Sequence, residues 1–348
     1  PGRILYEQNV GEVGHGLGAV DEETFFDLAS LTKVIATSTL LARATEQNEV
    51  TWTDDLAPSF DLQAPAKIID ILAHRAGFAA HRPFYRTLKN KVSPGTFEAS
   101  AAVASEAARV ARGRATSRRT GDGAGSRTKG GGETSHPDGP ESYETVYSDL
   151  GFILLGAFLE TKLKAPLSSQ FAALGLSGLR FLDRRGPPAP VPVCPDKLVL
   201  TGQTGPRGTA HDENAAFMGG AAGHAGLFGT ARGVFGWAAD LLQSFHGLSG
   251  GLLRPETVQT MWERPPHRFA FGFDHPTGSL STAGPLWPKE GVGHLGYTGT
   301  SVWIAPNQKL IAVLLTNRVA RGTDVGRMRR FRYAVHEAVF RAYGLGGL

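Results

Sequence analysis

The sequence is poor in residues that cross-link a fold or hold a metal through thiolates. Cys194 is the only cysteine among 348 residues, which excludes an internal disulfide and a thiolate metal cluster. No apolar run approaches the roughly 18 residues that a bilayer-spanning helix requires, so we expect no integral membrane segment. The chain opens at Pro1 without an initiator Met, and we expect that an upstream piece, with or without a signal peptide, has been removed.

The excess of positive charge is small and local. Lys and Arg number 36 against 32 Asp and Glu, for a net charge of +4. Arginines gather in residues 112–142 and again near the C-terminus, at Arg327, Arg329, Arg330 and Arg332. Neither group belongs to a recognisable nucleic-acid-binding module. We interpret both as solvated surface and expect no nucleic-acid partner.

The order of periodic segments predicts an α/β fold of the α+β type, an antiparallel sheet flanked by helices. Glycine-interrupted apolar residues at 3–18 indicate strands. Apolar spacing predicts helices at 31–45, 66–74, 150–163 and 327–343, and a hairpin from 301–305 and 309–316. We expect a sheet domain from residues 1–55 and 215–348, built from the N-terminal strands and the last third of the chain.

Residues 56–214 are expected to form a mostly helical subdomain. Within it, residues 112–142 are rich in Gly, Arg, Ser and Thr and poor in apolar residues. Such a segment buries too little apolar surface to offset its ordering entropy. We predict a disordered basic loop there, and an extended surface chain at 186–195.

The first motif with chemical content is Ser30-Leu31-Thr32-Lys33, at the start of a predicted helix. Residues three apart share a helix face, so the Ser30 hydroxyl and the Lys33 amine can meet. A lysine whose pKa is lowered by burial can take the serine proton. A second copy, Ser126 to Lys129, lies in the basic loop and shows how easily the pattern arises by chance.

Two further segments strengthen the case for Ser30. Tyr147-Ser148-Asp149 directly precedes a predicted helix, and a phenol whose pKa is lowered by a nearby ammonium can act as a general base. His294-Leu295-Gly296-Tyr297 leads into a predicted strand, where the Tyr297 N–H can serve as an oxyanion donor beside that of Ser30. Gly296 allows a substrate to pair along the strand edge.

These three segments, in this order, resemble the β-lactamase-like serine hydrolases, which include class C β-lactamases, penicillin-binding proteins, D-aminopeptidases and family VIII carboxylesterases. Residues 26–33 resemble the first motif of that superfamily together with the residues that usually precede it. Tyr147 to Asp149 matches the Y-x-N position and His294 to Gly296 the K-T-G position. Residues 222–228 resemble its glycine-rich stretch.

The resemblance implies an acyl-enzyme on Ser30, with Lys33 and Tyr147 sharing the proton transfers and the amides of Ser30 and Tyr297 binding the oxyanion. Two residues depart from the family pattern. His294 replaces a lysine that offers a permanent cation to a substrate carboxylate. Asp149 replaces an Asn and, when ionised, only accepts hydrogen bonds, so it can pair with Lys33 or bind a substrate amine.

Several functions remain open. We expect an esterase or a D-amino-acid peptidase of the D,D-carboxypeptidase kind, acting on small acyl substrates or cell-wall peptides. The alternatives are a weak β-lactamase and a non-catalytic domain that binds penicillin or peptidoglycan fragments. A metal hydrolase using His211, Asp212, Glu213, His224 and His294 is disfavoured because no ligand motif is present.

We expect no metal and no organic cofactor. The resemblance favours an extracytoplasmic or periplasmic location.

Overall fold

The main sheet is assembled from the last third of the chain. The computed structural model describes residues 2–112, 144–185, 194–202, 206–277 and 281–344. In these residues five antiparallel strands follow one another in sequence order: β4 (Phe269–Ala270), β5 (Phe273–Asp274), β6 (Val292–Leu295), β7 (Ser301–Ala305) and β8 (Leu310–Leu314). The predicted hairpin is therefore confirmed as β7 and β8.

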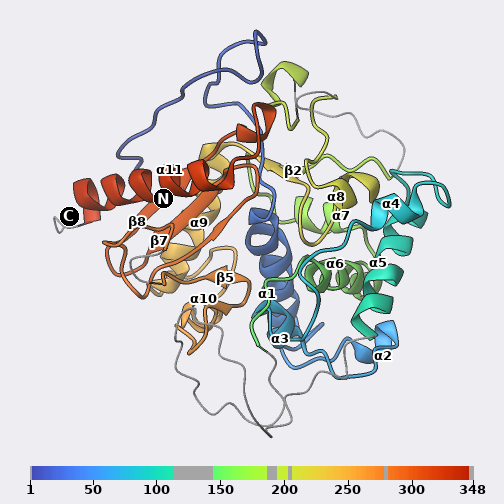
Figure 1. The fold of residues 1–348 in the computed structure, drawn as a ribbon. Coiled ribbons are helices and arrows are strands. Elements are labelled where there is room, and N and C mark those ends of the chain that lie inside the picture. Colours follow the sequence, from blue (N-terminus) through green and yellow to red (C-terminus); the bar gives the residue numbers. More distant parts are fainter. Residues whose placement is uncertain (1, 113–143, 186–193, 203–205, 278–280, 345–348) are drawn as a thin grey trace, which may run out of the picture.

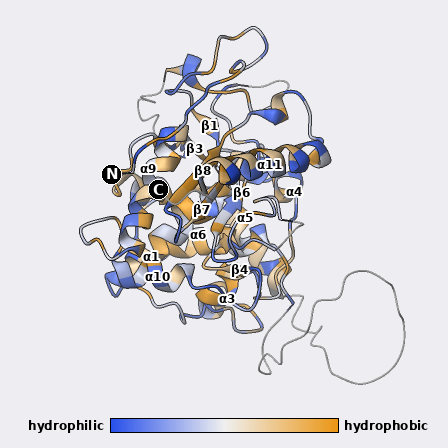
Figure 2. Ribbon diagram, turned by 90° about the vertical axis from the view of Figure 1, so that its left-hand side faces the viewer, coloured by the Kyte–Doolittle hydropathy of each residue, from blue (hydrophilic) through white to orange (hydrophobic). Residues whose placement is uncertain are grey.

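Strand β7 is buried on both faces of this sheet. Ser301 and Trp303 face helix α11 (Val325–Val339), where the Ser301 hydroxyl meets His336 Nε2 at 3.1 Å. The alternate residues Val302 and Ile304 join the main hydrophobic core, toward α9 (Ala231–Phe245). Figure 1 shows α11 and α9 on either side of β7 and β8, and in Figure 2 the strands are mostly hydrophobic whereas α11 carries many hydrophilic residues. Helix α10 (Pro255–Trp262) packs against α9.

A smaller sheet leads the chain to Ser30. Its antiparallel strands lie in the order β1 (Phe26–Asp27), β3 (Leu227–Gly229) and β2 (Leu179–Phe181). Strand β1 ends three residues before Ser30, and the helix that follows starts at Leu31. Its π-helical part covers Lys33–Ser38 and continues into α1 (Thr39–Glu46). The sequence predicted this helix correctly, although not its wider first turns.

The remaining helices fill the part of the chain between the sheet-forming segments. They are α2 (Ala57–Phe60), α3 (Ile68–Leu72), α4 (Phe84–Leu88), α5 (Phe97–Arg112), α6 (Asp149–Leu163), α7 (Leu167–Ala172) and α8 (Glu213–Phe217), with short 3-10 turns at Pro195–Lys197 and Arg318–Ala320. Helix α6 is apolar on every side and lies beside α5 (Figure 1). A helix of that composition belongs in a core. A Cβ at Gly156 would lie 2.8 Å from the Gly223 nitrogen, so close packing there requires glycine.

The expectation of strands at residues 3–18 is wrong. The segment forms only an isolated bridge, Glu12 with Ala19, and contributes nothing to the main sheet. Its apolar side chains are largely exposed, with Tyr6 at 66% and Val10 at 74%. Alternation of apolar residues produces a strand only where a partner edge is available. The first strand of the structure is β1, which follows this segment and pairs with β3.

The α+β class itself is confirmed, with an antiparallel sheet flanked by helices. The predicted basic loop at 112–142, apart from Arg112 at the end of α5, and most of the segment 186–195 lie outside the described residues. The division into a sheet domain and a helical subdomain stays a prediction. No helix in the described ranges has the length and apolar character needed to cross a membrane.

Candidate active site

Ser30 lies at the junction between β1 and the first long helix. Ala29, just before it, has a φ of 48°, a left-handed backbone that an alanine adopts only at a cost. The Asp27 carboxylate holds this turn by accepting the Ala29 N–H at 2.8 Å. The turn leaves Ser30 half-buried, with its Oγ accepting a hydrogen bond from Lys33 Nζ at 3.0 Å.

Lys33 is fully buried and uses its amine in three contacts. Besides Ser30, Nζ donates to Asp149 Oδ1 at 2.8 Å and to the His224 carbonyl at 3.1 Å. Burial alone would lower the pKa of Lys33, but the Asp149 carboxylate, first through its charge and then through its hydrogen bond, outweighs burial with a smaller contribution from Tyr147 and raises the pKa above its usual value. The predicted lowering of the Lys33 pKa is therefore wrong, because Asp149 takes the role of partner to Lys33, one of the two roles that the sequence left open for it. In the resting site Lys33 is an ammonium that donates to Ser30.

Tyr147 lies against the same ammonium. Lys33 Nζ is 5.0 Å from the centroid of the phenol ring. Burial raises the pKa of Tyr147, and the charge of Asp149 raises it further. Interactions with Lys33 and Ser30 lower the pKa, but the net shift is upward. The predicted lowering of the phenol pKa is wrong in net direction, although the ammonium has the expected effect. The phenol is protonated at rest.

Asp149 connects the amine to the start of α6. The Ser148 hydroxyl caps this helix by accepting the Gly151 N–H at 3.3 Å, which fixes Asp149 in the first turn. Its Oδ2 meets His81 Nδ1 at 3.1 Å, while Oδ1 holds Lys33. Burial opposes ionisation of Asp149, but Lys33 and His81 keep its pKa below the usual range. Of the two roles considered for Asp149, the structure shows the pairing with Lys33.

His294 is buried on β6, with its ring centroid 5.9 Å from that of Tyr147. Its Nδ1 lies 2.8 Å from the Leu295 carbonyl and donates to it, so Nε2 carries a lone pair, and this atom has no hydrogen-bond partner in the described part of the chain. Burial, followed by the Lys33 charge, lowers the pKa of His294 to about 3. The position that holds a lysine in K-T-G is therefore neutral, as expected for a histidine.

The turn at 296–300, which joins β6 to β7, is fastened to the residues ahead of Ser30. Thr298 Oγ1 donates to the Asp27 carbonyl at 2.7 Å, and Thr300 Oγ1 donates to the Leu28 carbonyl at 3.1 Å. A Cβ at Gly296 would lie 2.6 Å from the Leu28 oxygen, so only glycine permits this approach.

Tyr297 lies in this turn, not in a strand as the sequence suggested. Its side chain is 49% exposed and stacks on His211, with ring centroids 5.3 Å apart. Arg318 covers the phenol ring at 4.8 Å and donates from Nε to the Tyr297 carbonyl at 2.9 Å. The backbone N–H groups of Ser30 and Tyr297 donate to no backbone acceptor in the described ranges, so both remain available to a ligand.

The sequence missed several residues that support the site. His74 accepts the Ser148 N–H on Nδ1 at 2.9 Å and packs its ring against that of Tyr147, with centroids 4.5 Å apart. Asp27 accepts the His211 N–H at 2.7 Å as well as that of Ala29, and burial raises its pKa to about 6. Asp27 stands within the first motif and could have been found there, whereas no local pattern marks His74.

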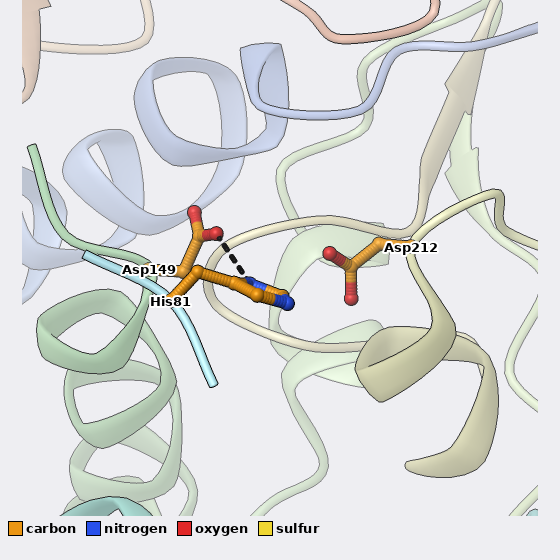
Figure 3. A group of neighbouring side chains, drawn as sticks. All are labelled: His81, Asp149 and Asp212. Carbon is orange, nitrogen blue, oxygen red and sulfur yellow. Dashed lines mark hydrogen bonds and ion pairs between the residues drawn. The ribbon is translucent and has the colours of Figure 1, made fainter. Parts of the chain in front are cut away.

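One cluster has the composition of a metal site. His81, Asp149 and Asp212 offer ligand atoms within 4.8 Å of one another, and Figure 3 shows the His81 ring between the two carboxylates. Both carboxylates already have cationic or imidazole partners, Lys33 for Asp149 and His224 Nε2, at 2.9 Å, for Asp212. Of the residues weighed as metal ligands from the sequence, only Asp212 belongs to this group in the described ranges.

Comparison with known proteins identifies the family. The family model described as Beta-lactamase matches residues 1–337. The chain belongs to the Beta-lactamase family. A curated relative from Salmonella agona, named "Putative D-alanyl-D-alanine carboxypeptidase", is 28% identical over 333 residues, covering 85% of this chain and 69% of the relative. The resemblance inferred from the three motifs is thereby confirmed.

Solved structures share the fold. A penicillin-binding protein homologue from Pyrococcus abyssi, described as octameric, superimposes with a TM-score of 0.64 at 14% identity, covering 98% of this chain and 71% of that one. EstCE1, described as a hydrolase with promiscuous acyltransferase activity, gives a TM-score of 0.62 at 21% identity, covering 96% and 91%. This chain is thus a β-lactamase-fold member of a hydrolase family.

Proposed function

We propose that this β-lactamase-family protein is a serine hydrolase that works through an acyl-enzyme on Ser30. The observation that carries the proposal is the 3.0 Å contact between Ser30 Oγ and the fully buried Lys33 ammonium. A surface lysine three residues after a helix-capping serine would not be desolvated in this way. The hydrogen bonds of Thr298 and Thr300 to the Asp27 and Leu28 carbonyls support a second backbone donor at the site, because they hold the turn that carries the Tyr297 N–H against the residues just before Ser30.

The reaction proceeds in two acyl transfers. Ser30 Oγ attacks the substrate carbonyl and loses its proton to a base, while the backbone N–H groups of Ser30 and Tyr297 stabilise the oxyanion. Collapse of this intermediate expels the leaving alcohol or amine, which takes up a proton. Water then attacks the ester on Ser30, releasing the acid and restoring the hydroxyl. An oxyanion donor of this kind is worth on the order of 3–4 kcal/mol in the transition state.

The base is the Lys33–Tyr147 pair after it has lost one proton. Both groups are protonated at rest, since the pKa of each is raised. Removing one proton leaves either a phenolate next to an ammonium or a neutral amine next to a phenol. Either form accepts the Ser30 proton. The pair therefore acts as one titrating unit.

The substrate class we favour is an ester or a peptide of D-amino acids. The neutral His294 offers no permanent cation to a substrate carboxylate, which favours uncharged acyl groups such as those of simple esters. The name of the Salmonella agona relative supports cell-wall peptides as a second substrate class, and the description of EstCE1 supports acyl transfer.

A covalent probe tests the proposal directly. Intact-mass analysis after treatment with a fluorophosphonate should show one adduct on the wild-type chain, located on Ser30, and none on Ser30→Ala. Comparing short-chain p-nitrophenyl esters, D-Ala-D-Ala peptides and nitrocefin on both proteins then ranks the substrates. Hydrolysis that survives in Ser30→Ala would exclude the mechanism.

A further inference from the structure

Arg332 is a buried cation at the turn that carries Tyr297. It lies on the inner face of α11 with 8% exposure, whereas Arg327, Arg329 and Arg330 on the same helix are exposed. The interpretation of all four arginines as solvated surface is therefore wrong for Arg332. Helical spacing explains this, because Met328 and His336, four residues away on either side, are also buried.

The guanidinium of Arg332 bonds to backbone carbonyls. Its Nη2 donates to the carbonyl oxygens of Gly296 and Thr300, the latter at 2.8 Å. Among the residues that the structure describes, no carboxylate forms an ion pair with Arg332. Burial, and then the charge of Arg318, lower its pKa to about 10. A buried charge without a counterion is costly, so its retention calls for a compensating role.

The contact with Gly296 has a specific chemical consequence. The Gly296 carbonyl and the Tyr297 N–H belong to one planar peptide unit, joined by a bond with partial double-bond character. A cation at the oxygen draws electron density through that bond and makes the N–H a stronger donor, as in other polarised hydrogen-bond chains. It also fixes the plane, so the direction of the N–H is set. The Gly299 N–H adds a second contact to the same oxygen, at 3.0 Å.

We propose that Arg332 is a positioning residue that orients and polarises the Gly296–Tyr297 peptide, so that the Tyr297 N–H stabilises the oxyanion formed on the substrate. This inference rests on the proposed acyl-enzyme function. Arg332 touches no reacting atom and acts only through the peptide unit that it bonds.

Arg318 provides an internal comparison. It also donates to the turn, but to the carbonyl of Tyr297, which belongs to the next peptide unit. Its charge therefore polarises the Thr298 N–H and not the Tyr297 N–H. If Arg332 merely anchored the turn, loss of either arginine would have similar effects on the reaction.

The test compares Arg332→Lys and Arg332→Gln with wild type. Arg318→Gln shows the effect of losing an arginine that only anchors the turn, and Arg330→Gln shows the effect of losing an exposed positive charge on the same helix. Steady-state kinetics on a short-chain p-nitrophenyl ester give kcat and KM. The infrared carbonyl band of a slowly hydrolysed, ¹³C-labelled acyl-enzyme reports the hydrogen bonding of the acyl oxygen. Arg332→Lys keeps a cation in place, so the inference remains testable if Arg332→Gln does not fold.

Arg332→Gln should lower kcat by about tenfold or more, a fraction of the loss on removing an oxyanion donor, with little change in KM. Arg332→Lys, which keeps the charge but loses the planar guanidinium, should lower kcat less than Arg332→Gln but still measurably. The acyl carbonyl band of both variants should move to higher frequency, whereas Arg330→Gln matches wild type and Arg318→Gln leaves the band unshifted. Folded Arg332 variants with wild-type kcat and band position would overturn the role of Arg332 and leave the proposed acyl-enzyme function untouched. A wild-type chain that forms no Ser30 adduct would overturn the proposed function instead.

Discussion

Lys33 Nζ and Asp149 Oδ1 are 2.8 Å apart, and this ion pair sets the resting protonation of the site. The carboxylate keeps the amine ionised despite its complete burial, and the ammonium in turn keeps Asp149 ionised. Ser30 therefore accepts a hydrogen bond at rest and does not donate one to a free base. Activation of the hydroxyl has to follow the loss of a proton from the Lys33–Tyr147 pair.

We predict that Asp149→Asn shifts the pH dependence of ester hydrolysis toward lower pH. In wild type, kcat/KM should rise toward alkaline pH, because the pKa values of Lys33 and Tyr147 are both raised. Removing the anion leaves burial to lower the pKa of Lys33, so the rising limb should move by at least about one pH unit. His81→Asn, which retains the anion, should leave the limb in place. Superimposable profiles for wild type and Asp149→Asn would refute this account.

Tyr147→Phe should reduce kcat by about 10²- to 10⁴-fold, the usual contribution of a group that transfers a proton. The ring contact with His74 survives the change, so the variant should unfold at nearly the wild-type temperature. Stopped-flow release of p-nitrophenol would show whether acylation is the step that slows. A Phe variant within threefold of wild type would remove Tyr147 from the proton transfer.

Gly296→Ala should impair both stability and activity. The new Cβ would lie 2.1 Å from Thr300 Oγ1 and 2.6 Å from the Leu28 carbonyl, so the turn must move away from the approach to Ser30. We expect a loss of about 1–3 kcal/mol in the free energy of unfolding. Gly236→Ala is a matched control, because a Cβ there meets nothing within 4 Å and the residue lies in α9. A wild-type rate in Gly296→Ala would show that the turn tolerates displacement.

Stability should fall as the pH drops below about 6.5. Burial lowers the pKa of His275 to about 4, of His294 to about 3 and of His336 to about 4, from the usual histidine value of 6.5. Below pH 6.5 the unfolded chain binds more protons than the folded chain. Each of these histidines therefore lowers the free energy of unfolding by up to about 1.4 kcal/mol per pH unit of acidification. Asp27, with its pKa raised to about 6, acts in the opposite sense between about 6 and 4.

Urea unfolding at pH 7 and pH 5 measures the difference in the free energy of unfolding between the two conditions, which should be on the order of 4 kcal/mol in favour of pH 7. His336→Gln should show a smaller difference, since an amide can still donate to the Thr282 carbonyl and accept from the Ser301 hydroxyl without titrating. Equal stability at the two pH values would contradict the assignment of these histidines as neutral.

Local sequence patterns predicted the parts of the site that are local in the chain. The S-x-x-K spacing placed Ser30 and Lys33 on one helix, and the apolar run after Tyr147 correctly predicted α6. The protonation states depend on the contact of Lys33 with Asp149, which is 116 residues away, and the sequence left this pairing open beside a contact of Asp149 with a substrate amine. Arg332 shows a different limit, since its charge suggested solvent while its helical spacing with Met328 and His336 indicated the buried face.

Residues 3–18 illustrate why part of the fold was mispredicted. Alternation of apolar residues identifies a chain that can pair, but not whether an edge is available to receive it. The hairpin at β7 and β8 succeeded because its two strands are neighbours in sequence and pair with each other.

The two threonine hydroxyls that reach from the 296–300 turn to the carbonyls of Asp27 and Leu28 join parts of the chain that are about 270 residues apart. If the turn between β6 and β7 moved away from the first helix, the Ser30 hydroxyl and the Tyr297 N–H would separate at the same moment. Enzymatic inactivation during heating should therefore coincide with the parting of these two regions, with no partially competent species in between.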